Sequence, residues 1–146
     1  MKKFAFSLEK VLGFKQQTLD VKKNELALLQ MKLTELEKEI YALNDQFAAT
    51  NRKMLEELQN GLSAGDLLIY KTYFNTLNQK ILHLIDQKKQ LLDIIAQKKA
   101  DIVAVNSEIS GLEKLRDKQL TEYLKQIQKS EELAMDEYVG QARGAV

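Results

Sequence analysis

Apolar residues recur at every seventh position through the first part of the chain. This file consists of Leu12, Leu19, Leu26, Leu33, Ile40, Phe47 and Met54. A second file lies three positions further on and is mostly apolar too, with Leu8, Lys15, Lys22, Leu29, Leu36, Leu43 and Thr50. Two interleaved files of this kind are the a and d positions of a coiled-coil heptad. The pattern predicts one long helix over about residues 4–59.

The heptad pattern stops near Gln59 and then starts again. Residues 60–66 supply two glycines and a capping pair, Ser63 and Asp66, which together favour a turn over about residues 60–65. The second set of a positions is Leu67, Phe74, Ile81, Lys88, Ile95, Ile102 and Ile109, and the d positions are Tyr70, Leu77, Leu84, Leu91, Lys98, Val105 and Leu112. No proline interrupts either repeat. A second helix is therefore predicted over about residues 66–139.

A short turn between two such helices favours an antiparallel hairpin, in which a residues of one helix face d residues of the other. The two repeats fit this arrangement when Met54 faces Tyr70 and Leu33 faces Leu91. In that register each lysine or arginine of the seam faces an aliphatic residue along which its stem can lie. A parallel homodimer of either helix would instead stack lysines on their own copies. We therefore predict an all-α fold, a long antiparallel two-helix coiled coil forming one elongated domain over residues 1–146.

The seam is not uniform along its length. The layers nearest the turn are apolar or aromatic except for Thr50, whereas charged residues enter repeatedly toward the termini. We expect the part near the turn to be the stiffer one. The same register leaves the chain from about Leu124 onward without a facing residue, a C-terminal helix overhang. Its sparse apolar positions, Leu124, Ile127, Leu133, Met135 and Tyr138, fit a partner-binding face and a fraying tail equally well.

Composition narrows the possible partners and locations. The net charge of +1 lacks the basic excess that phosphate binding requires, so nucleic acid is not an expected partner. Charged Glu9 and Lys10 interrupt the only N-terminal apolar stretch that could form a signal peptide. No apolar run approaches the roughly 20 residues that cross a bilayer, so any membrane association is expected to be peripheral or through a protein. The absence of cysteine suits a reducing compartment, and we expect the cytoplasm.

The sequence contains no constellation typical of catalysis. The single histidine, His83, falls at a c position, where a solvated surface role is expected. The glycines form no phosphate-binding loop, and the carboxylates alternate with lysines as on a solvated helix face. We predict a protein that is not an enzyme and has no cofactor and no metal site. Tyr41 and Tyr73 lie outside the seam, at b and g positions, where aromatic residues are candidates for partner contacts.

Three local features are similar to one known family. They are the N-terminal segment from Phe4 to Leu12, the Asn60-Gly61 break with Tyr70 to Leu77 after it, and the C-terminal run Met135-Asp136-Glu137-Tyr138. With the length and the long coil, the chain resembles the FliJ family, the stalk and escort components of the flagellar type III export apparatus. The resemblance covers essentially the whole chain.

This resemblance implies a non-enzymatic stalk that inserts into the hexameric flagellar export ATPase and stimulates it. It also implies a link to the membrane-embedded export gate, escort of export chaperones, and a place at the inner face of the cell membrane at the flagellar base, needed for motility and chemotaxis. The ATPase contact would comprise Phe4, Phe6, Leu8, Leu12, Met135 and Tyr138. The gate contact would comprise Leu43, Tyr73 and Leu77, with Tyr41 and Phe47 beside them.

Two other functions are compatible with a two-helix coil. A stalk protein of a virulence type III secretion system would look similar, and only the resemblance separates it. A prefoldin-like chaperone would use strands beside the coil to assemble, and the sequence predicts no strand.

Overall fold

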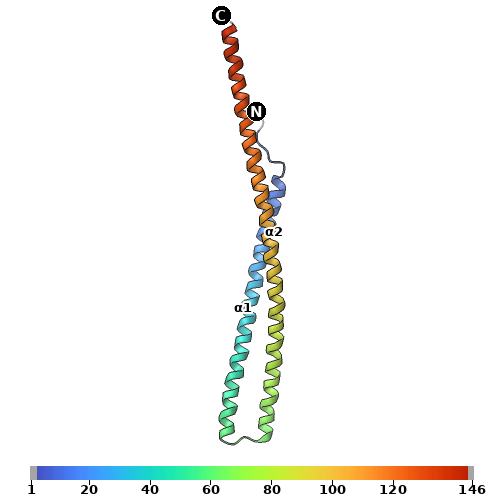
Figure 1. The fold of residues 1–146 in the computed structure, drawn as a ribbon. Helices are drawn as coiled ribbons and strands as arrows, with labels where there is room; N and C mark the ends of the chain where they lie inside the picture. The colour runs from blue at the N-terminus through green and yellow to red at the C-terminus, as the bar shows by residue number, and fades with distance from the viewer. Residues whose placement is uncertain (1–2, 145–146) are drawn as a thin grey trace. The chain divides into compact units, whose positions relative to one another are not determined.

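The structure, a computed structural model, describes residues 3–144, which form a short non-helical N-terminal segment and two long helices. Helix α1 spans Glu9–Gln59 and helix α2 spans Ala64–Gly144, with residues 60–63 forming the turn between them (Figure 1). The helices pack against each other as a hairpin, and α2, with 81 residues, is the longer. The predicted all-α two-helix hairpin is therefore confirmed. The first two and last two residues of the predicted domain lie outside the described residues.

The chain divides into two compact units, which are described separately. The terminal unit contains residues 3–21 and 102–144 of the described chain, and the turn unit contains residues 22–101. Both units use the a and d positions of the two repeats as their packing surface.

Helix α1 begins later than the predicted residue 4. The backbone N–H of Glu9 donates to the carbonyl of Phe6 at 3.1 Å, and the N–H of Leu12 donates to the carbonyl of Leu8 at 2.9 Å. Before this first turn the chain is not helical, and the Phe6 side chain is only 7% exposed. Burial of a large apolar side chain contributes about 1.5–3 kcal/mol, more than the extra helical residues would be expected to add. Packing of Phe6 thus replaces the first predicted helical turn.

The terminal unit holds a compact apolar core. Leu12 is the most deeply buried residue at 1% exposure, and Phe6, Leu19 and Ile109 join it. Partly buried apolar residues surround this cluster: Phe4, Leu8, Ile102, Val105 and Leu112. In the layers near the turn, Leu77 and Ile81 are buried, whereas Phe47 is 37% exposed. Phe4 and Phe6, which precede the helix, add apolar cover to the terminal unit.

The turn unit packs in the predicted register. Leu77, Ile81, Leu91 and Ile95 are buried. The predicted layers place Leu26 opposite Lys98 and Leu36 opposite Lys88. The residues next to these two leucines in α1 make the observed ion pairs. Glu25, beside Leu26, pairs with Lys98 at 2.5 Å, and Glu37, beside Leu36, pairs with Lys88 at 3.6 Å.

The turn uses the capping chemistry that its sequence predicts. The Gly61 N–H donates to the carbonyl of Leu58 at 3.4 Å, and Gly61 has a φ of 92°, the left-handed conformation common after a helix C-terminus. The Ser63 side-chain oxygen accepts a hydrogen bond from the N–H of Asp66 at 3.1 Å and so caps α2. Asp66, in the first turn of α2, also complements the helix dipole.

Replacing Gly61 with alanine should destabilise the hairpin by about 1–2 kcal/mol, because a Cβ disfavours the left-handed conformation. The measurement is the free energy of unfolding by denaturant, followed by circular dichroism. Gly111→Ala is the matched control: Gly111 lies within α2, and a Cβ there would meet no atom within 4 Å. This control should stabilise the protein by about 0.5–1 kcal/mol. Equal effects of the two substitutions would show that the turn does not require the left-handed residue.

Candidate functional site

The predicted gate residues divide into packed and exposed positions of the turn unit. Leu77 is 4% exposed and Leu43 is half-buried, so both act first in the seam. Tyr41 is the most exposed at 74%, and Phe47 and Tyr73 are each 37% exposed. Of the five predicted gate residues, only these three aromatic ones offer substantial surface to a partner.

Two of those aromatic residues meet at Phe74. The ring centroids of Phe47 and Phe74 are 4.7 Å apart, with planes tilted by 52°. Tyr73 lies 6.1 Å from Phe74 and Tyr70 lies 6.3 Å from it, so the cluster links both helices. Tyr41 is not part of the ring contacts described for this unit. The structure therefore brings Phe47 and Tyr73 together and leaves Tyr41 apart.

A hydrogen bond beside this cluster also joins the helices. The Tyr70 hydroxyl of α2 donates to Oε2 of Glu57 in α1 at 2.7 Å. This bond to a carboxylate raises the pKa of Tyr70 to about 12. Partial burial of the hydroxyl and the negative charges of Glu57 and Asp66 add to the effect. Tyr70 therefore packs in the seam beside Phe74, and its hydroxyl is held by Glu57 of the other helix.

Exposed aliphatic residues gather in sequence on either side of the turn. The sequence analysis predicted Leu67 as a seam position and did not single out the others. We call them the turn surface: Leu55, Leu58, Leu67, Leu68 and Ile69, which are 43–68% exposed. The detectable signal was the run Leu67-Leu68-Ile69 at the start of α2, because a heptad seam can cover only one residue of such a run.

The predicted ATPase-contact residues of the terminal unit also divide. Phe6 and Leu12 belong to the core, Leu8 packs against it, and the ring of Phe4 lies 5.6 Å from that of Tyr123. Met135 and Tyr138 are 64% and 71% exposed. The N-terminal members of the set therefore build the unit, and the two C-terminal members are available to a partner.

The C-terminal part of α2 carries an apolar face. Every residue from 128 to 144 is exposed, and this end of α2 continues beyond the N-terminal segment of the same unit (Figure 1). Helical spacing puts Leu124, Met135, Tyr138 and Val139 on one side and Leu133 on the opposite side. We call these first four residues the C-terminal surface. Val139, 41% exposed, was missed by the sequence reasoning, although its spacing of four from Met135 signals the shared face.

The described residues offer little to catalysis. His83 is exposed, and one of its ring nitrogens lies 3.2 Å from the amide nitrogen of Gln87 in the same helix. Across residues 3–144 no group of three or more histidine, cysteine or acidic side chains is arranged to hold a metal ion. Neither described helix has an apolar stretch that could span a membrane.

Comparison with known proteins gives one match. The family model described as "Flagellar FliJ protein" matches residues 4–144, which is nearly the whole chain. A search of curated proteins and a search of solved structures gave no match.

Tyr70 should titrate near pH 12 in the folded protein, compared with an ordinary value of 10.0. Because the folded pKa is raised, the stabilisation from this hydrogen bond is fully present below about pH 10 and is lost as the pH rises through 12. The measurement is the ultraviolet absorbance of ionised tyrosine, taken as the difference between the wild type and Tyr70→Phe.

Glu57→Ala is the control for this titration. This substitution removes the hydrogen-bond acceptor, so the pKa of Tyr70 should fall back toward its ordinary value of 10.0. A Tyr70 that titrates near pH 10 in the wild type would contradict the hydrogen bond.

Proposed function

The chain belongs to the FliJ family, whose members are non-enzymatic components of the flagellar type III export apparatus, and from this premise we propose that it is the stalk that stimulates the hexameric export ATPase. The observation that carries the proposal is the family match over residues 4–144. A two-helix coil with exposed apolar residues supports it, because a stalk acts only through the proteins that it contacts.

We propose that the C-terminal surface is the main contact with the ATPase ring. Met135 and Tyr138 are the exposed members of the predicted set, and Leu124 and Val139 extend their face. Tyrosine and methionine are enriched in the cores of protein interfaces, where they bury large areas. Phe4, Phe6, Leu8 and Leu12 contribute indirectly in this proposal, since they hold the terminal unit together.

Stimulation in this proposal requires no catalytic side chain on the stalk. A helix inside a ring presents a different face to each subunit, so it binds some subunit conformations better than others. Such differential binding shifts the populations of those conformations and thereby the nucleotide cycle.

The proposed contact with the export gate lies in the turn unit. Tyr73 and Phe47 form one exposed aromatic group at Phe74, and Tyr41 provides a second. Leu43 and Leu77 support this surface from the seam. Contact with the gate would place the protein at the inner face of the cell membrane through protein partners, and export chaperones would bind to it there.

The other two candidate functions are less well supported. The family match is to the flagellar protein, which favours flagellar export over virulence secretion. A prefoldin-like cage would use strands for assembly, and residues 3–144 contain no strand.

The direct test is ATP hydrolysis by the cognate flagellar export ATPase with and without this chain. The double variant Met135→Ala, Tyr138→Ala should raise the stalk concentration needed for half-maximal stimulation by at least about tenfold. Each interface anchor of this kind contributes roughly 1–2 kcal/mol. Leu133→Ala, on the opposite side of the same helix segment, is the matched control and should leave stimulation unchanged. Absence of both binding and stimulation by the wild type would refute the stalk proposal.

The gate contact is tested by swimming motility in a strain that lacks the wild-type protein. Tyr41→Ala, Tyr73→Ala should reduce the swimming rate while ATPase stimulation in vitro stays normal, because these residues are assigned to the gate and not to the ring. Val103→Ala, which also removes an exposed apolar side chain, is the control. Normal motility of the double tyrosine variant would refute the proposal that Tyr41 and Tyr73 contact the export gate.

A further inference from the structure

The apolar seam of the turn unit does not by itself determine how the helices align. A heptad repeat looks nearly the same after a shift of seven residues, because a positions again face d positions. Leu33 packs in register with Leu91, but a shift by one heptad would place it opposite Leu84, which is just as apolar. Another feature is needed to select one alignment.

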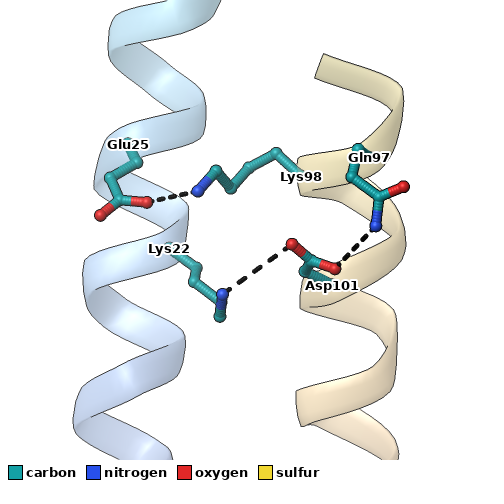
Figure 2. Close-up of polar contacts among 5 residues, drawn as sticks. All are labelled: Lys22, Glu25, Gln97, Lys98 and Asp101. Carbon is teal, nitrogen blue, oxygen red and sulfur yellow. Dashed lines mark hydrogen bonds and ion pairs between the residues drawn. The ribbon is translucent and has the colours of Figure 1, made fainter. Parts of the chain in front are cut away.

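Three lysines occupy seam positions in this unit, and each has an acidic partner on the other helix. Lys98 contacts Glu25 at 2.5 Å, and Lys22 lies 4.0 Å from Asp101 (Figure 2). Asp101 is also held by the Gln97 side-chain amide at 3.0 Å. Lys88 lies 3.6 Å from Glu37. The pairs therefore occur along much of the unit and not at one point.

The pairs follow one positional rule. A lysine at a d position contacts a g carboxylate of the other helix, as Lys98 does with Glu25. A lysine at an a position contacts an e carboxylate, as Lys88 does with Glu37. The terminal unit contains the same two classes, Lys15 with Glu108 and Arg116 with Glu9. All five ion pairs between the helices in the described chain obey this rule.

A shift of seven residues breaks these pairs. In one direction, Lys98 would meet Lys32 in place of Glu25, and Lys88 would meet Asn44 in place of Glu37. In the other direction, Lys88 would meet Gln30, and Lys22 would meet Ile94 in place of Asp101. In each direction at least two of the three lysines lose their carboxylate.

The lysines are sufficiently buried for this loss to matter. Only 22% of the Lys98 side chain and 25% of the Lys22 side chain are exposed. A partly desolvated ammonium group that loses its carboxylate keeps the desolvation cost without the compensating attraction. The hydrogen bond from Lys98 and its charge also hold the pKa of Glu25 below the ordinary range, which fits a pair with real electrostatic coupling.

We propose that the ion pairs of Lys22, Lys88 and Lys98 fix the register of the two helices in the turn unit. The seam supplies the attraction between the helices, and the three pairs exclude alignments displaced by a heptad. Polar seam residues are known to specify alignment in this way at some cost in stability. A fixed register sets which residues of α1 and α2 lie side by side, as Phe47 and Phe74 do.

Cross-linking can test this directly, because the chain contains no cysteine. One double-cysteine variant, Leu33→Cys with Leu91→Cys, reports the observed register. Two others report the shifted registers: Leu33→Cys with Leu84→Cys, and Ile40→Cys with Leu91→Cys. Disulfide formation is scored on the monomer band of a non-reducing gel.

These cysteine pairs are then combined with the triple substitution Lys22→Leu, Lys88→Leu, Lys98→Leu. Leucine favours helix and adds apolar seam contacts, so this protein should fold and melt at or above the wild-type temperature. We expect its shifted pairs to cross-link at least tenfold more than in the wild-type background, where only the Leu33 and Leu91 positions should react.

A charge-exchanged protein provides the matched control. It carries the substitutions Lys22→Glu, Lys88→Glu, Lys98→Glu, Glu25→Lys, Glu37→Lys and Asp101→Lys, which preserve every pair in the observed register. It should cross-link only in that register. Exclusive cross-linking of Leu33→Cys with Leu91→Cys in the leucine variant would overturn the proposal and assign the register to the turn. Cross-linking of the shifted pairs in the wild type would overturn it as well.

Discussion

Burial of the heptad seam between α1 and α2 is the interaction on which the rest of the structure depends. A single helix gains little from its own hydrogen bonds in water, and most of its stability in a protein comes from packing its apolar face. Each helix here has many charged residues outside the seam, and the seam is the apolar face that each helix buries against the other. Ile81 and Ile95 in the turn unit, and Leu12 and Ile109 in the terminal unit, become buried only because the other helix covers them.

The seam also limits where function can reside. A residue at an a or d position is occupied by packing, as Leu77 and Leu12 are, and contributes to recognition only through the shape that it supports. Recognition is left to residues on the outer faces and to the part of α2 that lies beyond the N-terminal segment. The FliJ family assignment and the exposed Met135 and Tyr138 agree with this division, because a protein without catalytic chemistry must act through its surface.

The charged seam residues show a different balance of forces. Lys98 and Lys22 occupy positions where leucine would pack better, yet both have carboxylate partners on the facing helix. Their long apolar stems cover the seam while their charged ends reach the pairs at its edge. The apolar packing of the seam therefore depends little on the alignment of the two helices, whereas the ion pairs of the seam lysines depend strongly on it.

The sequence alone determined the two helices and the position of the turn, because heptad periodicity, Gly61 and Ser63 are local signals with direct structural meaning. It also identified Met135 and Tyr138 as exposed candidates, since nothing in the register could face them. Only the tertiary structure decided that Phe6 replaces the first helical turn, that Phe47 and Tyr73 meet at Phe74, and that Tyr70 donates to Glu57. These features depend on side chains that are distant in sequence and come together only after the helices have packed. Periodicity records which face of a helix is apolar, but it does not record which individual groups meet across the seam.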